Sequence, residues 1–401
     1  MISSLLFAFV SAPLLVSYDF QDITPKENLP LGGYTERKDK LMDGIGERLS
    51  ARTLRIQQGQ TDVAIIAAEM LTIPGSLAEE VAQEAAKYGE RPVLLLAATH
   101  THCAPDSQML NRKMRMKVPG IAVFNSKQFE WYAEQLSKTL YRSEDTKSLE
   151  RVTVFVGEAD ANRSRAEGAP PIKTVTEIRF ETRTANYTVL NYAAHPTLRD
   201  AEFNQTSGDW PGAWMGWQTP RLFLQGAAGD VSPAPPGNAR GDAGIAEMKT
   251  ALESAKKSSR TFSASRLGTL KAVRIAVTMP AITPHPKFAE RNGVPEALAK
   301  IVVSGFAPDK ADVTLIRLGP IAFIGIPGEP SSAVGRRVLE KARAAGIEYP
   351  VIVSFANEWL GYILTAEEYA LGEYEATLSF HGPTLADEIL KAFERALAAA
   401  K

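Results

Sequence analysis

Two of the five histidines in the chain, His100 and His102, stand one residue apart. They follow the uncharged run at 92–96, which is typical of a buried strand that ends in a loop. Two imidazoles at the end of one strand can be directed at a common point, and α/β proteins place their chemistry at the carboxyl ends of strands. This stretch alone leaves two interpretations open: a metal or catalytic site, or a pair of solvated loop histidines.

The same arrangement, a strand followed by a short loop with a side chain that can bind a metal, recurs at His195, at Glu329 and around Tyr362. Each has an ordinary explanation when it is considered alone. A single loop histidine is usually hydrogen-bonded to its surroundings, and Glu329 is compatible with the acidic first turn of a helix. Together these residues supply two nitrogens and one or two oxygens, the ligand set of a catalytic zinc ion that keeps one position for water.

Composition narrows the alternatives. The chain has 401 residues, with 45 Lys and Arg against 46 Asp and Glu and a formal net charge of -1, which argues against a nucleic-acid binder driven by phosphate neutralisation. Its single cysteine, Cys103, excludes an internal disulfide and a cysteine-rich zinc cluster. A bound metal would therefore be held by histidine, carboxylate, tyrosine or water.

Alternating strand and helix patterns predict an α/β fold, a mixed β-sheet core flanked by helices with the active site at strand ends. A Ser-x-x-Glu pattern at 76–79 predicts a capping box that opens a helix to about residue 89. We expect a hairpin around Gly319-Pro320 between two apolar runs. The other expected strands lie at 14–20, 61–71, 92–96, 152–155, 175–180, 187–192, 221–225, 270–279 and 351–354, and the other expected helices at about 126–143, 243–256, from 331 and 384–399.

The first 13 residues form a short apolar segment that ends in small residues, compatible with a signal-like segment or with a first strand. We expect a single catalytic domain over residues 14–401, and no C-terminal β-sandwich. No stretch approaches the roughly 20 apolar residues that cross a bilayer. A secreted or periplasmic location is favoured over a cytoplasmic one, and the oligomeric state is not predicted.

Eight short motifs, spread over nearly the whole chain, resemble the catalytic domain of the neutral/alkaline (non-lysosomal) ceramidases, zinc amidases that cleave the N-acyl bond of ceramide. They are Asp22-Ile-Thr-Pro25, Gly33-Tyr34, Ala98-Thr-His-Thr-His102, Asn162-Arg163-Ser164, Ser207-Gly-Asp209, Gly229-Asp-Val-Ser-Pro233, Pro327-Gly-Glu329, and Asn357 through Tyr374-Glu375.

The resemblance implies a Zn²⁺ site and roles for particular residues. The implied zinc ligands are His100, His195, Glu329 and Tyr362. His102 would lie beside the metal, Ser232 close to the scissile amide, Tyr374 where it can hydrogen-bond the oxyanion, and Arg163 in the pocket lining. The family has Ser-Gly where this chain has Cys103-Ala104, and we interpret Cys103 as a small buried apolar residue rather than a ligand or nucleophile.

These observations predict a zinc-dependent hydrolase that cleaves the amide bond of an N-acyl amide, ceramide-like or smaller, by attack of metal-bound water. The expected partner is this small-molecule or lipid-amide substrate, with no nucleic acid. Two alternatives use the same scaffold: a zinc-dependent esterase or lactonase, and a non-catalytic binding homologue. Retention of every implied ligand disfavours the second alternative.

Overall fold

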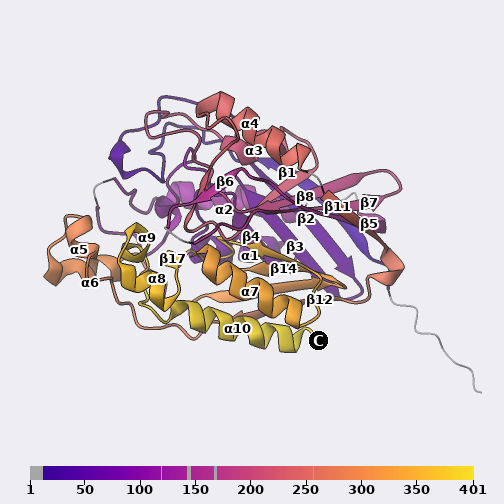
Figure 1. The fold of residues 1–401 in the computed structure, drawn as a ribbon. Helices are drawn as coiled ribbons and strands as arrows, with labels where there is room; N and C mark the ends of the chain where they lie inside the picture. Colours follow the sequence, from indigo (N-terminus) through magenta and orange to yellow (C-terminus); the bar gives the residue numbers. More distant parts are fainter. Residues whose placement is uncertain (1–11, 119, 142–145, 167–168, 256) are drawn as a thin grey trace, which may run out of the picture.

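A computed structural model describes residues 12–118, 120–141, 146–166, 169–255 and 257–401 (Figure 1). The predicted segment at 1–13 therefore lies, apart from its last two residues, outside the described part. The chain forms a large sheet and a smaller sheet, with helices on the outer face of each (Figure 1). The predicted class, a mixed sheet flanked by helices, is confirmed.

The large sheet has nine strands in the order β4-β3-β2-β1-β5-β7-β8-β9, and β11 also pairs with β5. It is mixed, because β3 and β4 are parallel, β8 and β9 are parallel, and the other pairs are antiparallel. Its strands are β1 (Leu15–Asp22), β2 (Ser50–Gln58), β3 (Thr61–Ala68), β4 (Val93–Ala98), β5 (Lys147–Glu158), β7 (Thr174–Thr182), β8 (Asn186–Tyr192), β9 (Arg221–Gln225) and β11 (Lys257–Ser263).

The smaller sheet has the order β12-β13-β14-β16, with strands β12 (Leu270–Ala276), β13 (Asp312–Leu318), β14 (Ile321–Gly325) and β16 (Tyr349–Val353). The predicted hairpin is confirmed, since β13 and β14 are antiparallel neighbours joined at Gly319-Pro320. Two short two-stranded ladders complete the pairing: β10 (Val231–Pro233) with β6 (Asn162–Ser164), and β15 (Glu329–Pro330) with β17 (Tyr362–Ile363).

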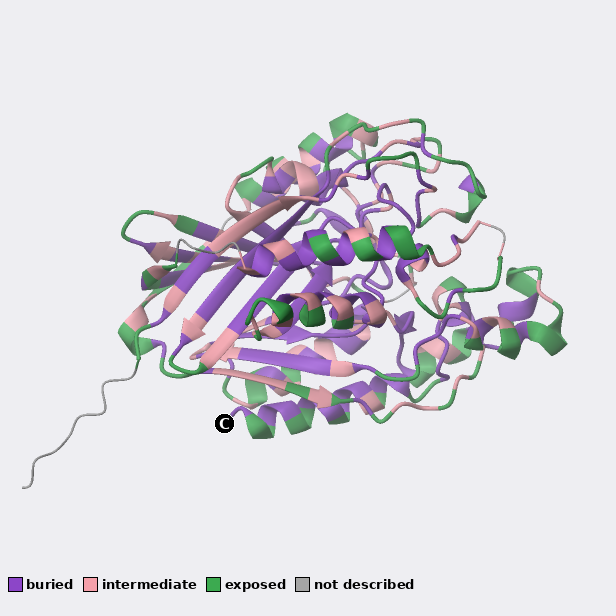
Figure 2. Cartoon of the chain, turned by 180° about the vertical axis from the view of Figure 1, so that it is seen from behind, coloured by how far each residue is buried: buried purple, intermediate pink, exposed green. Residues whose placement is uncertain are grey.

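The two sheets share one apolar core, and helices close their outer faces. In β3, Val63 and Ile65 contact the core between the sheets, whereas Ala64 and Ile66 face the helical layer. Burial on both faces explains the uninterrupted apolar run of this strand. Figure 2 shows these central strands buried and the outer helix surfaces exposed. The helices are α1 (Gly75–Lys87) and α2 (Ser126–Tyr141) on one side, α7 (Ser332–Ala344) and α10 (Leu385–Ala399) on the other, and α3 (Asp209–Met215) and α4 (Gly241–Ser254) over β8 and β9.

Strand β2 was not predicted, because its sequence contains two arginines and several polar residues. Both arginines are buried: Arg52 is 1% exposed and Arg55 is 6% exposed. The Arg52 guanidinium donates to the backbone carbonyls of residues 215, 216, 219 and 221, and Arg55 pairs with Asp62 and Glu90. Charged groups can enter a core when their hydrogen bonds are satisfied in this way, and a hydrophobic pattern does not reveal them.

The predicted capping box at the start of α1 is wrong. The Ser76 hydroxyl donates to the carbonyl of Leu110 and does not accept from the helix. The free N–H of Gly75 at the helix start is instead accepted by the carboxylate of Glu358, which is 283 residues away in the chain. A tertiary partner has therefore replaced the local one.

No helix in the described ranges is long and apolar enough to span a lipid bilayer.

Candidate metal site

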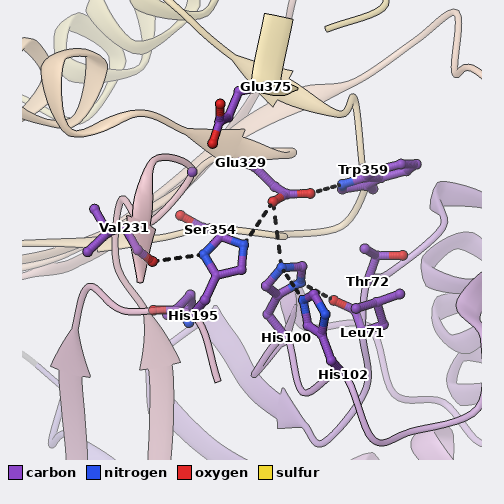
Figure 3. Close-up of polar contacts among 12 residues, drawn as sticks. Leu71, Thr72, His100, His102, His195, Val231, Glu329, Ser354, Trp359 and Glu375 are labelled. Carbon is purple, nitrogen blue, oxygen red and sulfur yellow. Dashed lines mark hydrogen bonds and ion pairs between the residues drawn. The ribbon is translucent and has the colours of Figure 1, made fainter. Parts of the chain in front are cut away.

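The loops that carry the predicted residues meet at the same end of both sheets. His100 follows β4, His195 follows β8, and Glu329 begins β15 just after β14. In the β15–β17 ladder Glu329 pairs directly with Tyr362. Figure 3 shows the side chains of His100, His195 and Glu329 converging from separate segments. The structure thus brings together residues that are as far as 262 positions apart (His100 to Tyr362).

Hydrogen bonds fix the orientation of two imidazoles. The Nδ1 atom of His100 lies 2.7 Å from the carbonyl oxygen of Leu71, and the Nδ1 atom of His195 lies 3.0 Å from that of Val231. A carbonyl can only accept, so Nδ1 carries the proton in each ring and the Nε2 lone pair is free. Burial lowers the pKa of both rings, that of His100 to about 4, so both are neutral at neutral pH.

Glu329 completes the convergence. Its Oε2 atom lies 3.6 Å from the Nε2 atom of His100 and 3.6 Å from that of His195. The Oε1 atom accepts from the indole N–H of Trp359 at 2.7 Å, but Oε2 is buried and has no hydrogen-bond partner among the described residues. Two lone pairs and an unsatisfied carboxylate oxygen, all buried, therefore face one point.

This donor set fits a zinc ion. Zinc–ligand bonds of about 2.0–2.1 Å in tetrahedral geometry separate ligand atoms by roughly 3.3–3.4 Å, close to the spacing here. Tyr362, the remaining implied ligand, is 5% exposed and its ring lies 6.1 Å from that of Tyr374. Burial, and then the negative charge of Glu329, raises the pKa of the Tyr362 phenol well above its usual value, so without a cation it stays protonated.

His102 lies beside these residues, but its ring nitrogens have different hydrogen-bond partners from those of His100 and His195. Its Nε2 atom is 3.3 Å from the Nε2 atom of His100, while its Nδ1 atom is buried without a partner among the described residues. The ligating nitrogens of His100, His102 and His195 lie within 4.8 Å of one another, so a three-histidine ligand set is also compatible with the distances. Ligating histidines usually donate their second ring N–H, which His102 does not, and this favours a role beside the metal.

The backbone around the cluster is unusual. His100 has a φ of 71° and Phe355 a φ of 56°, in the left-handed region that non-glycine residues rarely adopt. The Phe355 ring stacks on the His100 imidazole with 4.0 Å between ring centroids. Gly33, at a φ of 89°, lies against the His102 ring so closely that a Cβ there would be 2.4 Å from Nδ1. This contact gives a physical reason for the Gly33-Tyr34 motif.

The other predicted residues lie at the edge of the cluster. Ser232 in β10 pairs with Arg163 in β6. It directly follows Val231, whose carbonyl accepts from the His195 ring. Tyr374, at the start of α9 (Tyr374–Thr377), is 51% exposed. Arg163 is also exposed.

The structure identifies two neighbours that the sequence did not. Arg165, two residues after Arg163, is the cation whose charge, after burial, lowers the pKa of His195. Trp359 holds Glu329 through its indole N–H. Both lie inside or next to recognised motifs, but neither has a spacing that indicates contact with the cluster.

Cys103 is fully buried, as predicted, with an exposed fraction of 0%. Burial raises the pKa of its thiol to about 12, and the Arg37 guanidinium contacts the Sγ atom at 3.7 Å. A cysteine nucleophile needs the thiolate, which such a pKa disfavours.

Cys103→Ser should therefore leave turnover within a few-fold of the wild type, because the hydroxyl can also accept from Arg37. Steady-state kinetics with parallel zinc determination checks this. A loss of several orders of magnitude with zinc still bound would contradict it and would require a thiol mechanism.

Glu358 predicts a pH dependence of stability. Its Oε1 atom accepts from the backbone N–H groups of Gly75 and Trp359, and burial raises its pKa from the usual 4.5 to about 7. The folded protein thus retains a proton that the unfolded chain loses, so the associated stability is full below about pH 4.5 and is lost as the pH rises to about 7.

Glu358→Gln, which cannot ionise, should reduce the fall in unfolding free energy between pH 5 and 8 by about 2 kcal/mol. Urea denaturation at several pH values checks this. Equal slopes in the two proteins would show that Glu358 ionises normally.

Comparisons with known proteins give sequence matches that cover about a fifth to a quarter of the chain. Residues 297–391 match the family model described as "Neutral/alkaline non-lysosomal ceramidase, N-terminal". This range contains Glu329, Tyr362 and Tyr374 but neither His100 nor His195. A neutral ceramidase of Pseudomonas aeruginosa is 34% identical over 82 residues, and neutral ceramidase A of Dictyostelium discoideum is 34% identical over 83. Each match covers 20% of this chain and only 12% of the relative's length.

A structural comparison extends over nearly the whole chain, including the segments that carry His100 and His195. The crystal structure of the Pseudomonas aeruginosa neutral ceramidase superposes with a TM-score of 0.78 over 97% of this chain and 75% of that chain, at 19% sequence identity. At this identity the likeness shows a shared fold. The segment at 297–391 is thus similar in sequence to the neutral/alkaline non-lysosomal ceramidases, and nearly the whole chain is similar in fold to one of them.

Proposed function

We propose that this protein is a zinc-dependent hydrolase of N-acyl amides, ceramide-like or smaller. One observation carries the proposal: the buried Oε2 atom of Glu329, without a hydrogen-bond partner among the described residues, lies 3.6 Å from the Nε2 atom of His100 and 3.6 Å from that of His195. An unpaired buried carboxylate oxygen is costly, and a cation between these atoms removes that cost.

His100, His195, Glu329 and Tyr362 would hold the ion. A bound zinc would supply Lewis acidity, which polarises a carbonyl and lowers the pKa of a water molecule bound beside the protein ligands. The Nδ1 bonds of His100 and His195 to backbone carbonyls keep both rings oriented, and the indole of Trp359 keeps the Glu329 carboxylate in place.

The remaining groups act on the substrate. Hydrolysis of the amide adds water across the C–N bond and releases a carboxylic acid and an amine. The hydroxyl of Tyr374 and the Nε2 side of His102 are the donors available for the oxyanion that develops, and Ser232 and Arg163 lie at the same rim. Residues 14–401 act as one catalytic domain in this proposal, supported by the apolar core that both sheets share.

We expect soluble N-acyl amides with short or medium acyl chains to be hydrolysed at least as efficiently as ceramide. The ligand residues contact only the amide and make no demand on a sphingoid chain. The 19% identity to the superposed ceramidase leaves the surroundings of the site free to differ. Values of kcat/KM over an acyl-chain series, in buffer and in detergent, check this expectation. Reaction of long-chain ceramides alone, and only with detergent or lipid, would refute it.

The proposed function is tested by measuring metal content and turnover together. The purified protein should contain one zinc per chain, and chelation followed by zinc addition should abolish and restore amide hydrolysis. A parallel panel of esters and lactones distinguishes the alternative chemistry on the same scaffold. Zinc-replete protein that cleaves none of these bonds would contradict an enzymatic role.

A further inference from the structure

Arg165 is held at the edge of the candidate metal site by backbone and side-chain contacts. It follows β6 directly, and its N–H donates to the carbonyl of Asp230 at 2.7 Å. Its guanidinium donates to the carbonyl of Gly229 through Nη2 and to the Glu375 carboxylate through Nε, the latter at 2.8 Å. The side chain therefore links the loop before β10 to helix α9.

This position adjoins the segment that carries Glu329. The N–H of Gly229 donates to the carbonyl of Pro330 at 2.9 Å, and a Cβ on Gly229 would lie 2.6 Å from the Glu329 carbonyl oxygen. Glu375, labelled in Figure 3 near Glu329, belongs to the same helix as Tyr374. Arg165 therefore contacts the loop that packs directly against the Glu329–Pro330 backbone.

The guanidinium also has unused binding capacity. Its side chain is 30% exposed, and among the described residues its Nη1 group contacts no acceptor. An arginine has five N–H donors in a planar fork that matches a carboxylate, and the two contacts to Gly229 and Glu375 use two of them. Glu375 is only 14% exposed, so the open side of the pair presents positive charge.

We propose that Arg165 binds a carboxylate of the substrate, so that this site selects N-acyl amides with a carboxylate near the scissile bond, N-acyl amino acids being the simplest class. This inference rests on the proposed amide hydrolysis. Water adds across the C–N bond, the acyl group leaves as a carboxylic acid, and the amine leaves with the second proton. Arg165 takes no part in the bond changes and acts through binding alone.

The test compares substrates matched in shape but not in charge. In the first pair the difference lies on the amine side: N-lauroylglycine carries a carboxylate there, and N-lauroylethanolamine carries a neutral hydroxyl. A succinic monoamide and the butyric amide of the same amine place the difference on the acyl side. A charge-assisted hydrogen bond favours the acidic substrate of the preferred pair by about 10- to 100-fold in kcat/KM.

Arg165→Gln should remove this preference, so that the ratio of kcat/KM between the acidic and the neutral substrate falls to about one. Arg165→Lys, which keeps the charge but not the fork, should retain part of it. The matched control is Arg151→Gln. Arg151 also donates through Nε to a glutamate, Glu181, at 2.8 Å, but lies on β5 and should leave the preference unchanged. Thermal unfolding of each variant shows whether it is folded.

The outcomes separate this inference from the proposed function. Equal turnover of acidic and neutral amides by the wild type, or equal loss of both in Arg165→Gln, overturns the role of Arg165 and leaves amide hydrolysis intact. If no amide is cleaved, the proposed function fails, and calorimetric titration with N-lauroylglycine and N-lauroylethanolamine still decides the inference. The inference is supported if the wild type binds N-lauroylglycine more tightly than N-lauroylethanolamine and Arg165→Gln does not. If Arg165→Gln keeps this preference, the carboxylate binds elsewhere, such as at the metal, and the inference is wrong.

Discussion

His195→Ala should leave the protein folded but nearly free of zinc, and should lower amide hydrolysis by about three orders of magnitude or more. His195 is 2% exposed, its Nδ1 atom is held by the Val231 carbonyl, and its Nε2 atom lies 3.6 Å from Glu329. Loss of an outer hydrogen-bond partner of a zinc ligand already costs about 10- to 100-fold in affinity, and loss of a ligand itself costs more. Elemental analysis and competition with a chelator measure the change.

His285→Ala is the matched control. His285 is also buried, at 7% exposed, but its Nδ1 atom accepts from the backbone N–H of Lys287 and its ring lies beside Tyr369, so it belongs to no part of the candidate metal site. This variant should keep its zinc and its turnover. Full zinc occupancy in His195→Ala would remove His195 from the ligand set.

His102→Ala should give the opposite combination, with zinc retained and turnover lowered by about 100- to 1,000-fold. The Nε2 atom of His102 faces the Nε2 atom of His100 at 3.3 Å, but within the part of the chain that the structure describes no group orients its other nitrogen as a ligand requires. We therefore expect it to act on the substrate carbonyl or its oxyanion. The measurement is kcat and zinc affinity on the same preparation.

A conservative variant sharpens this second test. His102→Gln retains a donor at a similar reach and should recover part of the rate lost in His102→Ala. If His102→Ala instead loses zinc as completely as His195→Ala, the three histidines form the ligand set, and Glu329 or Tyr362 must be reassigned.

Local patterns in the sequence were sufficient for the strand ends that carry the candidate site. The apolar run before His100, the run before His195 and the β13–β14 hairpin before Glu329 are periodic signals, and these depend only on neighbouring residues. The same patterns predicted a buried Cys103 and the sheet-and-helix class.

Patterns in the sequence were insufficient wherever a distant partner decides the outcome. Arg52 and Arg55 are buried in β2 because carbonyls and carboxylates from elsewhere in the chain satisfy them, and Glu358 rather than Ser76 caps α1. Local sequence patterns predict that a charged residue is exposed. Such a residue is buried only where hydrogen bonds from distant parts of the chain satisfy it.

Long-range contacts also explain why the sequence pointed to Arg163 whereas the structure points to Arg165. Both are arginines in one short segment, and the family motif points to the first. Contacts with Gly229 and with Glu375, 210 residues further along the chain, are what direct the second toward the candidate metal site. The sequence alone determined which strand ends bear the reactive groups. Only the tertiary structure decided which charges and hydrogen bonds surround them, because those contacts join residues whose separation in the chain carries no local signal.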